Sequence, residues 1–319
     1  MMRYSNFYFT SKIDENEIFT YKFVCDENVA VKGVVQISHG MAEHGKRYED
    51  FAKLLTDNGY NVYVNDHRGH GKTAKNLKSA GYLADENGFD CLVDDIHTLT
   101  EIIKEENKDV PLILFGHSMG SFASQSYAIK YGDEIDGLIL SGSNGDFGGK
   151  LDLANIVVKF TCKIKGRKYV SEFIDNLFFG SNNRSFKPCR TDYDWLSRDE
   201  KEVDKYIDDS MCGFKCTCGF FEDFIQGLKF IEDRENIIKI RKDLPILIIS
   251  GDKDPVGNNG RGLLNLKIRY EKSGIEDVKC ILYKDGRHEI LNEINKEEVK
   301  EDVMKWIVEK IENKKQNYY

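Results

Sequence analysis

Six short runs of aliphatic residues recur along the chain, and a turn follows each of them. Continuous apolar runs of this length are typical of strands covered on both faces, as in a parallel sheet. The chain is therefore predicted to contain six such strands, at residues 33–40, 60–67, 111–117, 136–143, 245–252 and 278–286.

Apolar residues at helical spacing lie between the second and third predicted strands and again near the C-terminus. Three- and four-residue steps of this kind predict amphipathic helices with one buried stripe each. Because strand and helix alternate, we expect an α/β fold with an open, mostly parallel central sheet and helices on both faces. Residues around 18–25 are expected to add antiparallel strands at the sheet edge. The two stripes are Phe89, Leu92, Val93, Ile96, Leu99, Ile102 and Ile103, and Val299, Val303, Trp306 and Ile307.

The alternation stops between the fourth and fifth predicted strands, where helical patterns continue without a strand of the core type. Structureless loops of this length are uncommon inside a domain, so the stretch is predicted to form an inserted helical cap. The expected organisation is a first core segment at 1–143, a cap at 144–242 and a second core segment at 243–319.

The charge balance excludes one class of partner. A chain of 319 residues with a formal net charge of −8 lacks the concentrated basic face that nucleic-acid binding requires. The basic run at 163–168 is short and is interpreted as a solvated surface. No run of eighteen apolar residues and no N-terminal leader pattern is present, so a cytoplasmic location is expected.

Eight cysteines are scattered along the chain, which is unlike the dense pattern of small disulfide scaffolds. Most are expected to be free thiols. Cys212, Cys216 and Cys218 form a cluster in the sequence, but a structural zinc site needs paired knuckles and a fourth ligand. No histidine close in the sequence supplies one, so ordinary buried cysteines are favoured over a metal site.

The third predicted strand runs directly into Gly116-His-Ser-Met-Gly120, a G-x-S-x-G pattern between a strand and a helix. This pattern is the nucleophile elbow of serine hydrolases, in which a sharp turn lifts the serine above the sheet. The two glycines are expected because side chains there would collide with neighbouring backbone. Ser118 is therefore the predicted nucleophile.

A serine hydroxyl needs a general base and an acid that orients the base. His288 is the only histidine after Ser118, and it follows the last predicted strand. For the acid, Asp252 and Asp254 both follow the fifth strand, and Asp285 lies too close to His288 in the sequence. Asp254 is preferred because it lies farther into the loop, and Asp252 is interpreted as a turn residue.

The oxyanion hole of such enzymes takes one backbone N–H from the residue after the nucleophile and one from the loop after an earlier strand. Met119 occupies the first position. Met41, in the loop that follows the first predicted strand, is the expected second donor.

Six segments together resemble the monoacylglycerol lipase and lysophospholipase branch of the α/β-hydrolase superfamily. They are HGMAEHGKRY (39–48), DHRGHGKT (66–73), GHSMGS (116–121), RTDYDWLSRD (190–199), MCGF (211–214) and GDKDPVG (251–257). The resemblance implies the α/β-hydrolase fold, a triad of Ser118, Asp254 and His288, and Met41 and Met119 as oxyanion donors. Met41 stands where this family usually has a small residue, and Ser121 stands where a second glycine is common.

The other polar residues of these segments are interpreted as supports. His117 is expected to pack or give polar support, and His97 is expected to be exposed. Loop-bracing roles are expected for Asp66, Arg68 and His70, and for Glu43, His44 and Arg47 beside the oxyanion loop.

The leading functional hypothesis is a serine ester hydrolase that forms an acyl-enzyme and needs no metal or organic cofactor. Apolar cap helices are expected to form a slot for the acyl chain of a monoacylglycerol or lysophospholipid, and an exposed cap face would allow transient contact with a membrane or micelle. The sequence does not indicate the oligomeric state.

Two alternatives stay open. A serine aminopeptidase of the proline iminopeptidase type would need acidic cap residues to hold a free amine, for which Glu202, Asp204 and Asp208 are available. The second alternative is a hydrolase-fold binding protein without activity.

Overall fold

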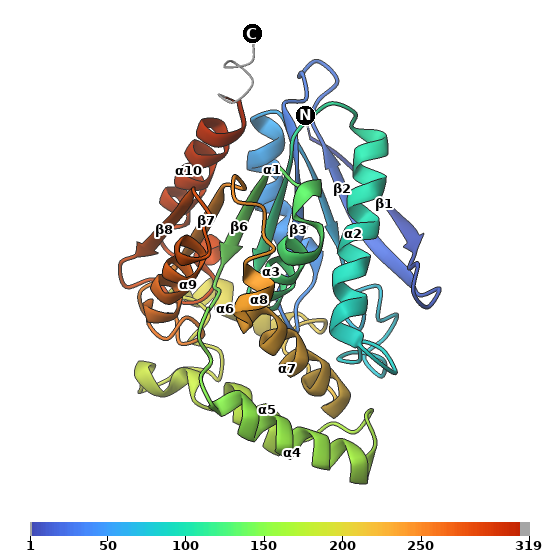
Figure 1. Cartoon of the computed structure of the whole chain (residues 1–319), viewed down its shortest axis with the longest axis vertical. Helices are drawn as coiled ribbons and strands as arrows, with labels where there is room; N and C mark the ends of the chain where they lie inside the picture. The colour runs from blue at the N-terminus through green and yellow to red at the C-terminus, as the bar shows by residue number, and fades with distance from the viewer. Residues whose placement is uncertain (1, 313–319) are drawn as a thin grey trace.

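The computed structural model describes residues 2–312, and its centre is a mostly parallel sheet (Figure 1). The strand order is β1-β2-β4-β3-β5-β6-β7-β8. All six predicted strands are present and pair in parallel, which confirms the predicted α/β fold class. The strands are β1 (Arg3–Thr10), β2 (Glu17–Val24), β3 (Gly33–Ser38), β4 (Tyr60–Asn65), β5 (Leu112–His117), β6 (Gly137–Ser141), β7 (Ile246–Gly251) and β8 (Val278–Tyr283).

The antiparallel edge expected near residues 18–25 is also present. Strand β2 pairs antiparallel with β4, and β1 pairs antiparallel with β2 in a long ribbon. The ribbon covers the side of β4 that would otherwise be an open edge of the parallel sheet.

Helices cover both faces of the sheet because successive residues of each central strand point to opposite sides. In β5, Leu114 belongs to the apolar core beneath α2, α3 and α9, whereas Phe115 belongs to the core beneath α1 and α10. The helices are α1 (Glu49–Asp57), α2 (Gly88–Glu106), α3 (Met119–Tyr131), α4 (Lys150–Lys165), α5 (Glu172–Phe179), α6 (Glu200–Asp208), α7 (Cys218–Glu232), α8 (Arg234–Ile237), α9 (Arg261–Lys272) and α10 (Lys296–Ile307).

The two predicted helical stripes correspond to α2 and α10, and nearly all of their residues are buried. His97, on α2, was expected to be exposed, and this prediction is wrong. Its ring is half-buried and stacks on Tyr131 with the ring centroids 3.9 Å apart.

Five helices, α4 to α8, lie in the chain between β6 and β7. Within the described part of this stretch, β-structure is limited to an isolated bridge between Val170 and Thr217. Helices α4 and α5 lie at the end of the molecule away from α1 and α10, whereas α7 packs on α2 and α3 as well as on α4 (Figure 1). The inserted segment is thus helical and is joined to the core through α7. The boundaries at 143 and 243 stay predictions, and residues 313–319 lie outside the described residues.

Neighbouring leucines on α9 give a direct test of this packing. Leu263 is fully buried, and Leu264 is 46% exposed. We expect Leu263→Ala to lower the free energy of unfolding by about 2–5 kcal/mol, because it removes buried methyl groups and leaves a cavity. Leu264→Ala should change it by less than about 1 kcal/mol. Denaturant unfolding measures both, and equal losses would contradict the placement of α9.

Candidate active site

The turn between β5 and α3 places Ser118 in a strained conformation, with φ 51° and ψ −120°. A positive φ at a residue other than glycine is uncommon and must be held by its surroundings. Here the Ser118 N–H donates to the Ser141 carbonyl at 2.9 Å, and the Ser121 hydroxyl donates to the Ser118 carbonyl at 2.6 Å. Ser121, which departs from the glycine common in the related family, therefore helps to hold the turn.

Both glycines of the motif lie where no side chain fits. A Cβ on Gly116 would lie 2.5 Å from the Gly120 carbonyl oxygen, and a Cβ on Gly120 would lie 2.0 Å from the Ser38 carbonyl oxygen. These contacts are far shorter than real Cβ contacts. The collision expected from the sequence is present, and it involves β5, the start of α3 and the end of β3.

Asp254 and His288 form a pair inside the protein. The His288 Nδ1 lies 3.0 Å from Asp254 Oδ1, and both side chains are buried. Asp254 also accepts hydrogen bonds from the Ser250 hydroxyl at 2.7 Å and the Val256 N–H at 2.9 Å. The carboxylate is thus fixed from three sides, with one oxygen directed to the imidazole.

Asp252 has a different partner. Its carboxylate accepts a hydrogen bond from the Asp285 N–H at 2.8 Å, which joins the loop after β7 to the turn after β8. Of the three candidate acids, Asp254 therefore pairs with His288. Asp252 and Asp285 instead join the two loops through the hydrogen bond between them.

The surroundings shift the pKa values of this pair in opposite directions. Burial disfavours the charged imidazole, but the charge and hydrogen bond of Asp254, with Glu289 and Glu43, outweigh burial and raise the pKa of His288. Burial likewise disfavours the carboxylate, yet His288 and the donors around Asp254 lower the pKa of Asp254. The arrangement stabilises an imidazolium that is paired with a carboxylate.

Ser118 and His288 line one cavity of about 380 Å³, and Met41 lines it with them. Many of its other lining residues come from the inserted helical segment, and they include apolar rings and polar side chains. The residues from that segment include Asp175, Phe179, Asp192, Tyr193, Trp195, Leu196, Tyr206, Phe214 and Lys215.

Main-chain contacts from the inserted segment to the histidine loop were missed by the sequence reasoning. The His288 N–H donates to the Trp195 carbonyl at 3.3 Å, and the Glu289 N–H donates to the Leu196 carbonyl at 2.7 Å. The indole ring of Trp195 also lies 5.0 Å from the imidazole ring. The segment RTDYDWLSRD is one of the six motif segments, but its pattern of residues does not predict these contacts with the loop after β8.

The predicted oxyanion residues come from two segments, since Met119 directly follows Ser118 and Met41 lies in the loop after β3. Met119 is buried as the first residue of α3, and Met41 is half-buried at the cavity wall. The Gly40 N–H donates to the Glu43 carboxylate at 2.5 Å. This hydrogen bond engages the Gly40 N–H, and Met41 is the next residue in the loop.

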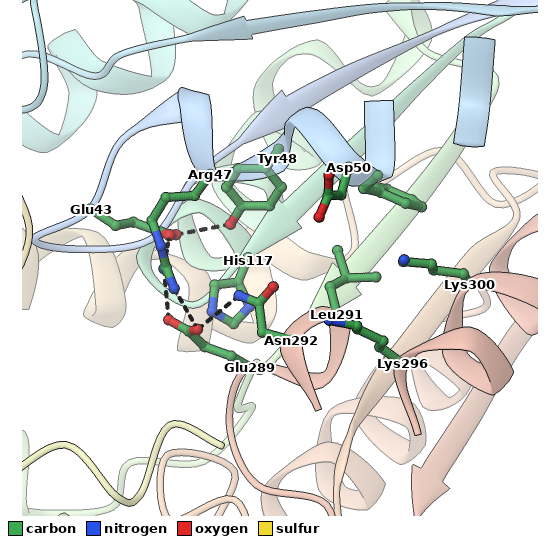
Figure 2. Close-up of a pocket in the computed structure, with 11 residues that line it drawn as sticks. Glu43, Arg47, Tyr48, Asp50, His117, Glu289, Leu291, Asn292, Lys296 and Lys300 are labelled. Atoms are coloured by element: carbon green, nitrogen blue, oxygen red, sulfur yellow. Dashed lines mark hydrogen bonds and ion pairs between the residues drawn. The ribbon is translucent and has the colours of Figure 1, made fainter. Parts of the chain in front are cut away.

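A largely buried ion pair joins the loop after β3 to the loop after β8, as Figure 2 shows. The Arg47 guanidinium forms two hydrogen bonds to Glu289, at 2.8 and 2.7 Å, and also contacts Glu43. Burial acts against ionisation of both carboxyl groups, but the Arg47 charge and hydrogen bonds lower the pKa of Glu43 to about 2 and also lower that of Glu289. His117 lies beside this pair, and burial lowers its pKa to about 4.

The loop after β4 is held by its own polar residues. Asp66 accepts hydrogen bonds from the Gly45 N–H and the Lys72 N–H, both at 2.7 Å. Arg68 is fully buried and pairs with Asp95 at 2.8 Å. These contacts agree with the predicted loop-bracing roles.

All eight cysteines are free thiols. Cys216 and Cys218 are buried, as expected, whereas Cys212 is half-buried. Between residues 2 and 312, no helix has the length and apolar character needed to cross a bilayer.

The α/β-hydrolases have a serine on a strained strand-to-helix turn in the middle of such a sheet. In their sequences an acid and then a histidine follow this serine, as they do here. The sheet order and the helices on both faces place the chain in that class. Within the class, the chain belongs to the family described as serine aminopeptidase, S33, whose model matches residues 29–295.

Similar proteins include ester hydrolases from bacteria and animals. A monoacylglycerol lipase of Mycolicibacterium smegmatis is 29% identical over 87% of this chain and 88% of its own length. A monoglyceride lipase of Mus musculus is 28% identical over 88% and 84%, respectively. The crystal structure of a thermostable carboxyl esterase from Bacillus coagulans, in complex with glycerol, has a TM-score of 0.90 and 29% identity, over 98% of this chain and 100% of that chain.

Glu289 provides a test of the electrostatics at His288. His288, the predicted base, must be neutral to accept a proton, so kcat/KM on a soluble ester should fall as pH drops through its raised pKa. Glu289→Gln removes a negative charge that stabilises the imidazolium, and the acidic limb should therefore move to lower pH.

Asp285→Asn is the matched control, because Asp285 is exposed and lies only three residues from His288. Its acidic limb should coincide with that of the unaltered protein. A shift of the Glu289→Gln limb to higher pH would contradict the assignment.

Proposed function

We propose that this chain is a serine ester hydrolase that cleaves monoacylglycerols or lysophospholipids through an acyl-enzyme. The main support is that Ser118, His288 and apolar side chains of the inserted segment line the same cavity, and that His288 is paired with Asp254. The names of the similar lipases and esterase, and the glycerol bound to the esterase, support an ester of a glycerol-like alcohol.

In the proposed mechanism, the Ser118 hydroxyl attacks the ester carbonyl and His288 accepts its proton. Asp254 orients the imidazole and stabilises the imidazolium. The Met41 and Met119 N–H groups stabilise the oxyanion of the tetrahedral intermediate, for which one such donor typically contributes about 2.7–4 kcal/mol. His288 then protonates the leaving alcohol, and it later activates the water that releases the acid.

We further propose that residues 144–242 act as the cap that selects the substrate. Part of the cavity wall comes from this segment, and it contains Phe179, Trp195, Leu196 and Phe214 beside polar residues. A volume of about 380 Å³ lies within the range of small-molecule sites. The apolar part of this wall favours an acyl chain as the ligand.

The aminopeptidase alternative shares the fold and the proposed triad. The acids considered for amine binding do not line the cavity: Glu202 pairs with Lys296, Asp204 pairs with Arg190, and Asp208 is exposed. Asp175 and Asp192 do line it, and they are the residues through which a free amine would be held.

Assays of the two substrate classes separate these functions. We expect hydrolysis of monoacylglycerols and of p-nitrophenyl esters, with a maximum at an acyl length set by the cavity, and little activity on aminoacyl anilides. Ser118→Ala should lower kcat on the esters by about 10⁴-fold or more, because the nucleophile is lost. Circular dichroism checks that the variant is folded.

Labelling with a fluorophosphonate provides an independent readout. The unaltered protein should be labelled and Ser118→Ala should not. Activity on anilides alone would favour the aminopeptidase, and an unlabelled native protein would favour a binding protein without activity.

We propose that the cap also contacts a lipid surface through α4 and α5. On α4, four apolar side chains at three- and four-residue spacing are between 59% and 67% exposed: Leu153, Ile156, Phe160 and Ile164. Phe173 on α5 is 67% exposed. Lys159, Lys163 and Lys165 lie on the same α4 helix, and this combination is typical of helices that lie on anionic bilayers.

Sedimentation with anionic phospholipid vesicles tests this contact. Ile156→Ser with Phe160→Ser should weaken binding at least about tenfold, since burial of each such side chain contributes about 1.5–3 kcal/mol. Leu264→Ser with Ile268→Ser is the matched control, because both residues are exposed at the same spacing on α9. Equal binding of the two double variants would contradict α4 as the contact surface. Turnover of a short soluble ester should stay unchanged in both.

A further inference from the structure

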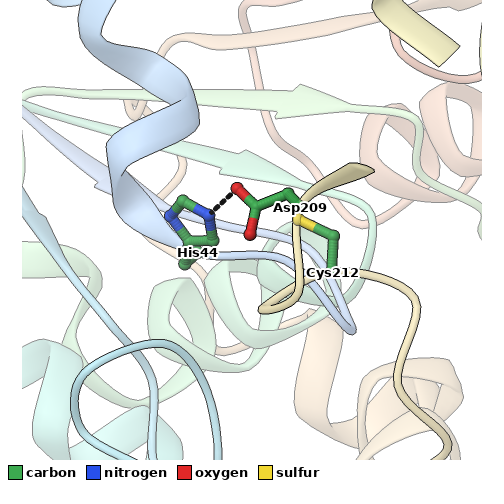
Figure 3. A group of neighbouring side chains, drawn as sticks. All are labelled: His44, Asp209 and Cys212. Atoms are coloured by element: carbon green, nitrogen blue, oxygen red, sulfur yellow. Dashed lines mark hydrogen bonds and ion pairs between the residues drawn. The ribbon is translucent and has the colours of Figure 1, made fainter. Parts of the chain in front are cut away.

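Three side chains of types that can ligate a metal meet in one cluster, as Figure 3 shows, and none of them lines the cavity of Ser118 and His288. They are His44, Asp209 and Cys212, and their ligand atoms all lie within 4.8 Å of one another. The His44 Nε2 lies 2.9 Å from Asp209 Oδ2. The sequence around Cys212 gives no signal of this histidine, because His44 is 165 residues from Asp209 along the chain.

Local hydrogen bonds hold the two cap residues in position. The Asp209 carboxylate accepts the Met211 N–H at 2.8 Å, and the Cys212 N–H donates to the Asp209 carbonyl at 2.9 Å. His44 is 5% exposed and lies directly before the short helix η1 (Gly45–Tyr48). The three side chains are thus presented by two ordered backbone segments, one from the core and one from the cap.

We propose that His44, Asp209 and Cys212 form a binding site for a zinc-class divalent cation. Imidazole nitrogen, carboxylate oxygen and thiolate sulfur are the three ligand types of protein zinc sites, and three protein ligands leave a fourth position for water. On binding, the Cys212 Sγ forms a bond to the metal and releases its proton to solvent. The thiolate and the carboxylate together then balance the charge of the ion.

The surroundings allow such an ion. The nearby Arg47 guanidinium is already paired with Glu43 and Glu289. The Asp209 side chain is 35% exposed, and Cys212 is half-buried, so the site is accessible from solvent.

The ion would join two segments that already touch beside the oxyanion loop. The Ala42 carbonyl accepts hydrogen bonds from the Gly213 N–H and the Tyr206 hydroxyl, both at 2.9 Å. His44 lies two residues after Ala42, and Cys212 precedes Gly213. Metal binding therefore adds a cross-link between the core and the cap, and it should raise the melting temperature.

Metal titration of the full chain tests the site without an activity assay, so the outcome is independent of the proposed ester hydrolysis. After treatment with a chelator, the protein should bind one equivalent of Zn²⁺ in competition with a chromophoric chelator. With Co²⁺ it should show a thiolate-to-cobalt charge-transfer band. Loss of a residue that only supports a zinc ligand typically lowers affinity about 10- to 100-fold, so Cys212→Ser and Asp209→Asn should each lower it by about 100-fold or more.

Cys189→Ser is the control, because Cys189 is exposed and lies outside the cluster. It should retain the zinc affinity, the cobalt band and the rise in melting temperature. Absence of the cobalt band in the unaltered protein would overturn the proposal. Zinc binding by Cys212→Ser with the affinity of the unaltered protein would overturn it as well.

Discussion

The turn at Ser118 is the constraint to which the other parts of the proposed site are fitted. A left-handed conformation at a serine costs of the order of 1–3 kcal/mol, and it persists only where the surroundings determine it. Here the end of β3, the end of β5 and the start of α3 approach so closely that only glycine fits at 116 and 120. The serine therefore stands at one fixed place above the sheet, and the loops after β3, β7 and β8 must reach it.

Those loops are joined to one another by buried polar contacts. Arg47 connects the loop after β3 to the loop after β8, and Asp254 connects the loop after β7 to His288. Burying charges is expensive, and removal of one partner from a buried pair typically costs about 3–5 kcal/mol because the other charge is left uncompensated. The Arg47 network is thus a weak source of net stability, and it links the two loops directly.

Much of this architecture could be predicted from the sequence because it depends on local patterns. The apolar runs predicted the six parallel strands, and the G-x-S-x-G motif after β5 predicted the strained turn. The preference for Asp254 over Asp252 rested on loop position, and the two side chains do have different hydrogen-bond partners. The catalytic roles of Ser118, Asp254 and His288 stay predictions.

The parts that could not be predicted depend on contacts between distant segments. The meeting of His44 with Asp209 and Cys212, the packing of α7 on the core and the stacking of His97 on Tyr131 leave no periodic signal in the sequence. The carbonyl groups of Trp195 and Leu196 are another example, because backbone hydrogen bonds of this kind do not depend on residue type.

These two carbonyl groups also restrict how the protein can change shape. Because they hold the amides of His288 and Glu289, the histidine is attached to both halves of the molecule: to the core through Asp254 and to the inserted helices through its own main chain. Any rearrangement that carried residues 195 and 196 outward would either break these bonds or pull the imidazole away from its carboxylate. A ligand that displaced residues 195 and 196 would therefore also act on the position of the His288 main chain.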